Sequence, residues 1–193
     1  RALLQCFRRS GFNHERDRLI VLGDVCDGYP ELRQCISELS KIKHCDFIYG
    51  NHDLCALEWA SQRGKRKIIK NQGGQSAMHA YGEESLTPNQ IAFLKRGKLW
   101  LELKDQLFVH GGFDPEIPLS ENTEEMLVWD RDLLGAASRK HLIDPKHRFG
   151  GYADIFLGHT PTQHYESSEP IKFCNVWALD TGAGWGGPLS ACP

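Results

Sequence analysis

Short apolar runs in this sequence alternate with segments in which apolar residues recur every three or four positions. Residues 18–22 and 46–49 form two such runs and predict buried strands. Between them, residues 30–42 show the spacing of a helix, and Pro30 suits its first turn. This succession of strands and helices predicts an α/β fold.

The same patterns predict the remaining elements. Helices are expected around residues 3–7 and over residues 54–62, 75–81, 88–95 and 123–134. Strands are expected over residues 98–103 and 106–109, as a hairpin, and over residues 155–157 and 173–179. Turns are predicted at residues 71–74 and at the glycine-rich residues 182–187. No internal repeat or linker divides the chain.

Composition narrows the class of protein. The 193 residues are enough for one domain with a sizeable core. The chain has 23 basic and 25 acidic residues, a net charge of −2, so general binding to nucleic acid is not expected. No apolar run approaches the roughly 18–20 residues of a membrane span, and the first residues do not resemble a signal peptide. We therefore expect no membrane partner.

The seven cysteines form no CxxC pair, and their number is odd. This usage argues against a disulfide framework and against a structural zinc site, and it is typical of a reducing compartment. We expect a cytoplasmic protein whose cysteines are mostly small, buried apolar side chains.

Polar clusters follow four of the predicted strands. Their sequences are GDVCD (23–27), GNHD (50–53), HGG (110–112) and GHT (158–160). Because ligands of α/β sheets bind beyond the carboxyl ends of strands, these clusters are expected to gather at one edge. They would bring together Asp24, Asp27, Asn51, His52, Asp53, His110 and His159.

These residue types point to metal chemistry. Aspartate, asparagine and histidine suit hard or borderline divalent cations, whereas a thiolate site would need a cysteine cluster. Asp24 could bridge two ions, and Asn51 offers a neutral oxygen that keeps the site electrophilic. Two ions about 3.5–4 Å apart would acidify a bridging water and hold a phosphoryl oxygen. The pattern therefore predicts hydrolysis of phosphate esters.

His52 directly follows Asn51. On an extended chain, neighbouring side chains point in opposite directions, so His52 need not bind the same metal. A carboxylate such as Asp27 beside it would raise the pKa of the imidazole. Protonated His52 could then donate to the leaving-group oxygen as a general acid.

With these clusters the sequence resembles the calcineurin-like metallophosphoesterases, and within them the bacterial branch of the phosphoprotein (serine/threonine) phosphatases. Further similar stretches are NQGGQSA (71–77), VWDRDLL (128–134) and LDTGAGWGGPL (179–189). The resemblance implies one α/β domain over residues 1–193, a four-layer α/β/β/α sandwich of two mixed sheets flanked by helices. It also implies two divalent metal ions, manganese first, with iron, zinc or magnesium as alternatives.

The resemblance assigns a role to each site residue. The metal ligands would be Asp24, which bridges the two ions, and Asn51, His110 and His159. His52 would be the general acid, paired with Asp27. Arg131 and Asn51 would bind the substrate phosphate, a task that a guanidinium fork performs better than a lysine.

The sequence departs from the family pattern in two places. The family begins with a GDxHG motif that binds the first metal, and this chain starts at Arg1, where that motif should just have ended. We expect a preceding segment with this motif and the first strand. The protein-phosphatase branch also reads GDxxDRG, whereas this chain has Asp27-Gly28-Tyr29. Without that arginine, the phosphate would depend more on Arg131 and the metals.

The expected substrate is a phosphomonoester, either a phosphoprotein carrying phosphoserine or phosphothreonine or a small phosphoester. One alternative is a dinucleoside polyphosphate hydrolase, in which Tyr29, Trp129 or Trp185 stacks on a base, although we expect all three to pack in the core. The other alternative is a degenerate fold that serves as a binding module. The retained polar clusters argue against it, because unused buried polar groups cost free energy.

Overall fold

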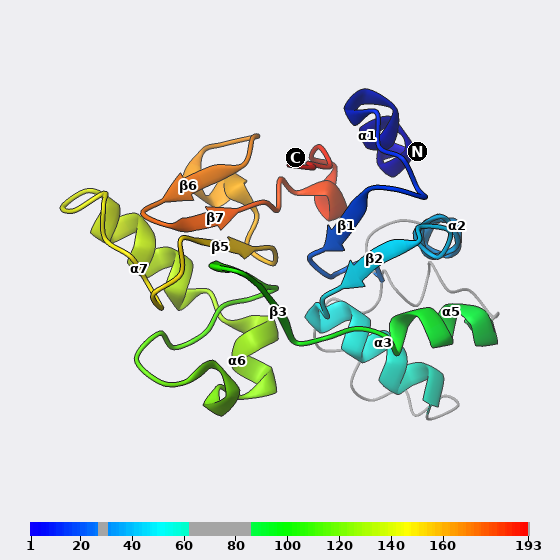
Figure 1. Cartoon of the computed structure of the whole chain (residues 1–193), viewed down its shortest axis with the longest axis horizontal. Coiled ribbons are helices and arrows are strands. Elements are labelled where there is room, and N and C mark those ends of the chain that lie inside the picture. Colours follow the sequence, from blue (N-terminus) through cyan, green and yellow to red (C-terminus); the bar gives the residue numbers. More distant parts are fainter. Residues whose placement is uncertain (27–30, 62–85, 193) are drawn as a thin grey trace. The chain divides into compact units, whose positions relative to one another are not determined.

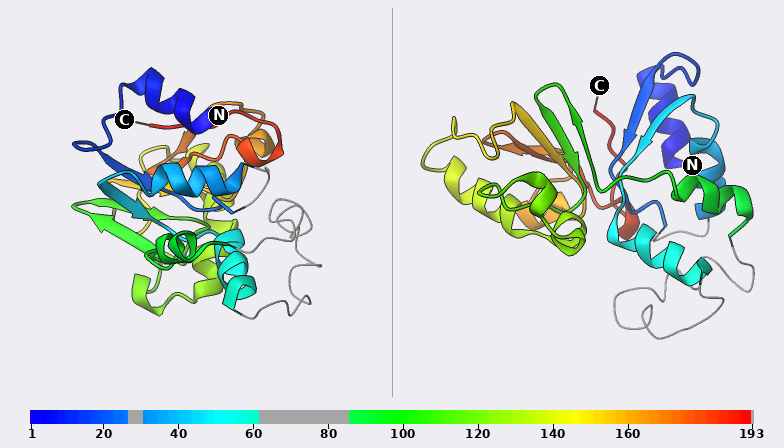
Figure 2. Two further views of the ribbon diagram at one scale, coloured as in Figure 1. Left: turned by 90° about the vertical axis from the view of Figure 1, so that its right-hand side faces the viewer. Right: turned by 60° about the horizontal axis from the view of Figure 1, so that its bottom comes forward.

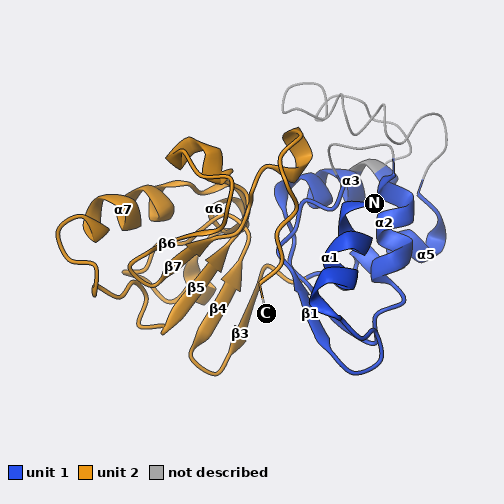
Figure 3. Cartoon of the chain, turned by 90° about the horizontal axis from the view of Figure 1, so that it is seen from above, with its two compact units in different colours: residues 1–97 blue, residues 98–193 orange. Residues whose placement is uncertain are grey.

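The computed structural model describes residues 1–26, 31–61 and 86–192. The chain divides into two compact units, residues Arg1–Gly97 and Lys98–Pro193 (Figure 3). Each unit has its own sheet and its own hydrophobic core. Two sheets flanked by helices were predicted, and this mixed α/β architecture is confirmed.

The first unit is built on two parallel strands, β1 (Arg18–Val21) and β2 (His44–Phe47), with Val21 opposite Phe47. Its helices are α1 (Ala2–Ser10), α2 (Leu32–Leu39), α3 (Asn51–Ser61) and α5 (Pro88–Leu94). Figure 2 shows these helices beside the strand pair. The core is formed by one face of α2 together with β2 and α5, and its buried members include Ile36, Leu39, Phe47, Phe93 and Leu94.

The start of α5 is determined by its local sequence. The Thr87 side chain accepts a hydrogen bond from Gln90 N, and the Gln90 side chain accepts one from Thr87 N. This reciprocal pair is a capping box, and Pro88 follows it at the first helical position. The helix expected over residues 88–95 therefore begins where its local sequence specifies a cap.

The second unit contains five strands in the order β3-β4-β5-β7-β6. They are β3 (Trp100–Leu103), β4 (Gln106–Val109), β5 (Asp154–Leu157), β6 (Ile171–Phe173) and β7 (Val176–Ala178). Strands β4, β5 and β7 run parallel, and the two outer strands run antiparallel to their neighbours. The helices are α6 (Glu124–Trp129) and α7 (Asp132–His141), with single turns η2 (Leu119–Glu121), η3 (Thr162–Tyr165) and η4 (Ala183–Trp185) (Figure 1).

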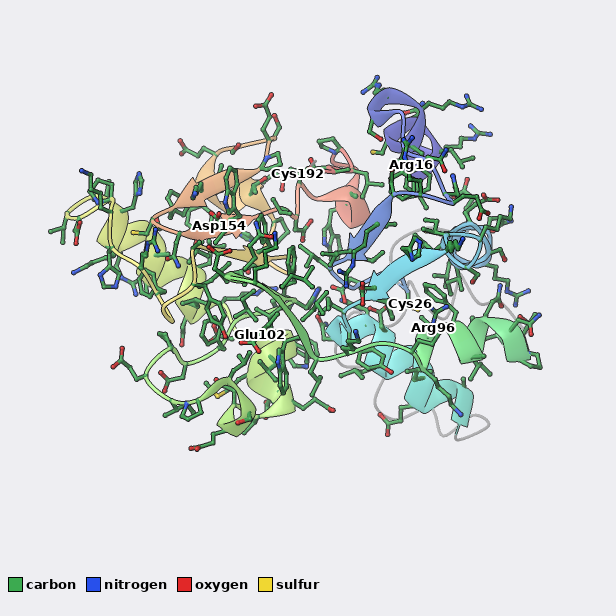
Figure 4. All side chains as sticks on the ribbon, viewed as in Figure 1. Arg16, Cys26, Arg96, Glu102, Asp154 and Cys192 are labelled. Carbon is green, nitrogen blue, oxygen red and sulfur yellow. The ribbon has the colours of Figure 1, made fainter. Side chains whose placement is uncertain are left out.

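Alternating residues of this sheet have different environments. Leu107, Val109, Ile155 and Leu157 are buried with Leu133 and Leu134 of α7. The side chains that alternate with these along the strands form a row of stacked aromatic rings, which we call the aromatic ladder. The centroid of the Phe156 ring lies 4.8 Å from that of Phe108 and 6.3 Å from that of Trp177. The ladder ends at Asp154, labelled in Figure 4, which accepts from Trp177 Nε1 and from Lys172 Nζ, both at 2.8 Å.

Two predicted elements were wrong in their extent. The single strand expected over residues 173–179 is a hairpin of β6 and β7, because Cys174 adopts a left-handed backbone (φ 55°) and turns the chain. The single helix expected over residues 123–134 is broken between α6 and α7. Asp130 is extended there, and its carboxylate accepts a hydrogen bond from Leu133 N in the first turn of α7. Such competition from an aspartate side chain favours a new helix start.

Three sequence-based predictions cannot be compared with the described structure. The turn at residues 71–74 and the helix at residues 75–81 lie outside the described residues, as does Pro30.

All seven cysteines are free thiols. Burial raises the pKa of the Cys35 and Cys45 thiols to about 11, so both remain protonated at neutral pH. In the part of the chain that the structure describes, no helix is long and apolar enough to cross a membrane.

Candidate metal centre

The loops that follow β1 and β2 are joined by one buried carboxylate. Asp53 is completely buried, and its Oδ2 accepts hydrogen bonds from Asp24 N at 2.7 Å and Gly50 N at 2.9 Å. Its Oδ1 accepts from Cys26 N at 3.0 Å. Three backbone donors therefore converge on one side chain, which fixes the two loops relative to each other. Asp53 stands third in α3, where an acidic side chain can reach back to the residue before the helix.

Gly50 allows the two loops to approach closely. A Cβ atom at this position would lie 2.0 Å from Asp24 Oδ1 and 2.4 Å from Asp24 N. Those distances exclude any side chain, so the glycine is a steric requirement. Asp24 itself has a left-handed backbone (φ 53°), a conformation that few residues other than glycine, asparagine and aspartate adopt.

His52 and Asp24 lie close together within the first unit. Asp24 Oδ1 accepts a hydrogen bond from His52 N at 3.1 Å, and Asp24 Oδ2 lies 4.0 Å from His52 Nε2. Asn51, which is 2% exposed, precedes His52 in the first turn of α3. The expectation of an extended chain here is therefore wrong, because α3 begins at Asn51 rather than at residue 54. The other predicted partner of His52, Asp27, lies outside the described residues.

In the second unit, two histidines meet at the carboxyl ends of adjacent parallel strands. His110 follows β4 and His159 follows β5, and the last residues of these strands, Val109 and Leu157, are register partners. The two rings are 5.1 Å apart, and one ligand nitrogen of each lies within 4.8 Å of the other. Both side chains are buried, at 1% and 8% exposure. His159 has a left-handed backbone (φ 62°), an uncommon conformation that it shares with Asp24.

Arg131 is placed beside this histidine pair by the break between α6 and α7. Gly111 N donates to Leu127 O at 2.8 Å, and a Cβ on Gly111 would lie 2.8 Å from Trp129 N. The chain after α6 is thus held against the HGG cluster. The Arg131 Nε donates to His159 Nε2 at 3.2 Å, and the Trp129 ring meets the His159 ring edge-on at 5.8 Å. The predicted phosphate ligand therefore adjoins a predicted metal ligand.

These residues fit a divalent cation. The first unit offers the buried oxygen of Asn51, and the second unit offers the buried imidazoles of His110 and His159. Oxygen and imidazole donors are those of manganese, iron and zinc sites. His110 and His159 are spaced closely enough to share one ion. A metal site made of these residues needs no cysteine ligand.

Two aromatic predictions can also be compared with the structure. Trp129 is partly buried and contacts His159. Trp185 is 77% exposed, so the expectation that it packs in the core is wrong. It lies in a turn with glycines at positions 182, 184, 186 and 187, which have no side chains to pack against the ring. Tyr29 lies outside the described residues.

Buried histidines beyond the strand ends of an α/β fold, with a partly buried aspartate among the donor side chains, are the features of a candidate metal centre. The calcineurin-like phosphoesterase family matches residues 1–181, and the chain belongs to that family. It is a hydrolase, and its family uses divalent metals and cleaves phosphoesters.

Relatives within the family differ in the substrates that they act on. The chain is 25% identical to a serine/threonine-protein phosphatase 1 of Salmonella typhimurium over 189 residues, which are 97% of this chain and 83% of that one. It is 26% identical over 166 residues to a symmetrical bis(5'-nucleosyl)-tetraphosphatase of Pseudomonas syringae. That match covers 83% of this chain and 51% of the relative.

Solved structures support the same fold. A putative diadenosine tetraphosphatase superposes with a TM-score of 0.70 at 16% identity, over 96% of this chain and 80% of its own. A cold-active protein tyrosine phosphatase superposes with a TM-score of 0.57 at 14% identity, over 97% of this chain and 68% of its own. At these identities the likeness concerns the fold alone.

Proposed function

We propose that this hydrolase cleaves phosphomonoesters, with phosphoserine and phosphothreonine among its substrates, by metal-activated water. The observation that carries the proposal is the buried pair His110 and His159 at adjacent strand ends, with the Arg131 guanidinium beside it. Imidazoles bind the cation, and the arginine fork binds the phosphate that the cation activates. The relative that covers most of both chains is named a serine/threonine-protein phosphatase, which supports this substrate class.

The proposed metal ligands come from both units, and residues 1–193 would then form one catalytic domain. They are Asp24, as the bridging ligand, and Asn51, His110 and His159, with manganese as the first candidate ion. Bound ions would supply an acidified water and neutralise charge on the phosphoryl oxygens. Asp53 holds the Asp24 loop in place, so it acts as a positioning residue for a ligand.

The proposed general acid is His52, which would donate a proton to the leaving-group oxygen. Asp24 adjoins the imidazole, with 4.0 Å between Oδ2 and Nε2. Asp27 would add a second carboxylate to this pair, as the family resemblance implies. Arg131 and Asn51 would hold the phosphate during the proton transfer.

The first experiment compares His159→Asn with His164→Asn, using manganese and a phosphoserine peptide. Asparagine tolerates the left-handed backbone of His159, so the fold should survive. We expect His159→Asn to lose at least about 100-fold in kcat/KM and to bind less metal, because a ligand is missing. His164, an exposed histidine of η3, should be replaceable without effect on either quantity.

In the same assay, Arg131→Lys should raise KM, since lysine lacks the planar guanidinium fork that binds two phosphate oxygens.

Wild-type activity that survives exhaustive chelation would contradict the proposal. So would a metal content of His159→Asn equal to that of the wild type.

A second candidate function is the hydrolysis of dinucleoside polyphosphates. One relative and one structural neighbour carry names of this activity. The structural observation that favours it is the exposed indole of Trp185, which is available to a planar ring. A panel of a phosphoserine peptide and diadenosine tetraphosphate, compared by kcat/KM, separates the two substrate classes.

A further inference from the structure

The first unit has an open groove beside its N-terminal helix α1, which is dark blue in Figure 1. The helix ends at Gly11, whose left-handed backbone (φ 68°) turns the chain back along it. Phe7 O then accepts hydrogen bonds from Gly11 N and Phe12 N. The groove follows this reversal of the chain and has a volume of about 390 Å³. Its lining consists of Leu4, Phe7, Arg8, Gly11, Phe12 and His14. We call it the α1 groove.

Three aromatic rings of the α1 groove pack on one another. The Phe12 ring stacks on Phe7, with 4.8 Å between the ring centroids. The His14 ring meets both edge-on, at 5.1 Å from Phe7 and 5.6 Å from Phe12. Phe7 is buried, whereas Phe12 and His14 are only partly buried, and Leu4 beside them is exposed. Part of this apolar surface therefore faces water and can bury a further apolar group.

The loop after α1 holds these rings in place. The side chains of Asn13 and Asp17 accept hydrogen bonds from backbone N–H groups of their own loop, at 2.8 to 3.1 Å. Lys43 N, just before β2, donates to His14 O at 3.0 Å. A Cβ on Gly11 would have no other heavy atom within 4 Å, so the space beside it is open. The groove is thus formed before anything binds, which lowers the entropic cost of binding.

The surface around the α1 groove is positively charged. Residues 1–18 contain five arginines and two acidic residues, a net charge of +3 in a chain whose net charge is −2. Arg16 and Arg18 are neutralised by Asp17 and Asp46, at 3.1 and 2.7 Å. Arg8 lines the groove, and within the described residues it forms no ion pair with an acidic side chain. An anionic group that enters the groove therefore meets an available guanidinium.

We propose that the α1 groove binds an acidic segment of a partner protein, with one apolar anchor side chain packed on the rings of Phe7 and Phe12. Ligand pockets begin at about 300 Å³, so this groove accommodates a single anchor. Carboxylates that flank the anchor pair with Arg8, whereas a basic segment is repelled. The charge thus selects an acidic partner, and the rings select the anchor. No residue of the groove belongs to the proposed metal centre, so the inference is independent of the proposed phosphoesterase function.

The first test titrates the ¹⁵N-labelled protein with the peptide Glu-Glu-Phe-Glu-Glu. Two matched peptides replace the phenylalanine by glycine or all four glutamates by lysine. We expect the backbone amides of residues 7–14 to shift, with a Kd at least about tenfold lower than for either matched peptide, because anchor burial and charge pairing both contribute. Added salt should weaken the binding, since exposed charges are screened.

Protein variants test which side chains make the contact. Arg8→Glu reverses the charge that lines the groove, and Leu4→Ser removes an apolar wall; both side chains are exposed, so the fold should be retained. We expect each variant to raise the Kd of the phenylalanine peptide about fivefold or more. Arg9→Glu is the matched control, because it makes the same charge change in the same last turn of α1 outside the groove. It should change the Kd by about twofold at most.

Several outcomes would overturn the inference. Equal binding of the glycine peptide would show attraction by charge alone, and equal binding of the lysine peptide would show that charge does not select the partner. Equal effects of Arg8→Glu and Arg9→Glu, or no shift of residues 7–14 at millimolar peptide, would also refute it. If those amides shift with protein concentration in the absence of peptide, the occupant is a second copy of this chain and the inference is wrong. A protein that binds the peptide as expected but hydrolyses no phosphoester contradicts only the proposed function.

Discussion

At the scale of single residues, the proposed general acid can be distinguished from a residue that only supports the loop. His52 lies at the start of α3, where its N–H binds the Asp24 carboxylate. If its imidazole protonates the leaving oxygen, its loss matters most when the leaving group is poor. We expect His52→Asn to slow a phosphoserine ester at least about tenfold more than p-nitrophenyl phosphate, because an alkoxide needs the proton and nitrophenolate does not.

The measurement is kcat for both esters in the metal-loaded variant. His44→Asn is a suitable control, since His44 is an exposed histidine at the start of β2. Equal slowing of the two esters, with metal content unchanged, would reject the assignment of His52 as general acid.

Residue types at strand ends were predictable, but their contacts were not. Asp24, Asn51, His110 and His159 follow strands, as their positions after apolar runs predicted. The role of Asp53 was missed, because its three backbone donors come from residues up to 29 positions away. The available signal was its place three residues after Gly50, where a carboxylate can cap a helix.

At the scale of elements, the aromatic ladder of the second sheet ends at the ion pair of Asp154 and Lys172, and this pair makes the stability of the fold depend on pH. Burial alone would raise the pKa of Asp154, but hydrogen bonds from Lys172 and Trp177 outweigh it and lower the pKa below its ordinary value. A carboxyl group with a lowered pKa in the folded state stabilises the fold above its unfolded pKa, about 3.9, and this contribution disappears as pH falls through the folded pKa.

Asp154→Asn should therefore reduce the free energy of unfolding by about 1 kcal/mol at pH 7, since the partly exposed ion pair with Lys172 is lost. The difference from the wild type should shrink below about pH 4. Urea denaturation at several pH values measures this difference in the free energy of unfolding. Asp105→Asn, in the turn between β3 and β4, is the control. A deficit that is as large at pH 3 as at pH 7 would show that packing rather than charge is responsible.

The predicted element boundaries were wrong where the backbone conformation of a single residue determines the boundary. The apolar run over residues 173–179 gives no sign of the left-handed Cys174 that separates β6 from β7. The helical spacing over residues 123–134 likewise continues through Asp130, where the structure changes helix. Periodicity reports which face of an element is buried, whereas a turn depends on the dihedral angles of one or two residues. The capping box at Thr87 was predictable because its signal is entirely local.

At the scale of the whole molecule, the proposed site predicts that metal stabilises both units together. Its ligands are drawn from residues 1–97 (Asp24 and Asn51) and from residues 98–193 (His110 and His159). An ion that binds only the folded form raises stability by mass action, about 2.7 kcal/mol at 100 times its Kd. For a chain of 193 residues this corresponds to a rise in Tm of roughly 5–10 °C. We expect manganese to produce this rise in the wild type and chelation to reverse it.

The variants extend this prediction to each unit. Asp24→Asn, which keeps a residue that tolerates the left-handed backbone, and His159→Asn remove ligands from different units. Because the ions are proposed to be shared, either substitution should abolish most of the manganese-dependent rise in Tm, and hydrogen exchange should show metal-dependent protection of both β1 and β5. If manganese protects only the unit whose ligands remain intact, the two units bind metal independently, and the proposal of one shared catalytic domain is wrong.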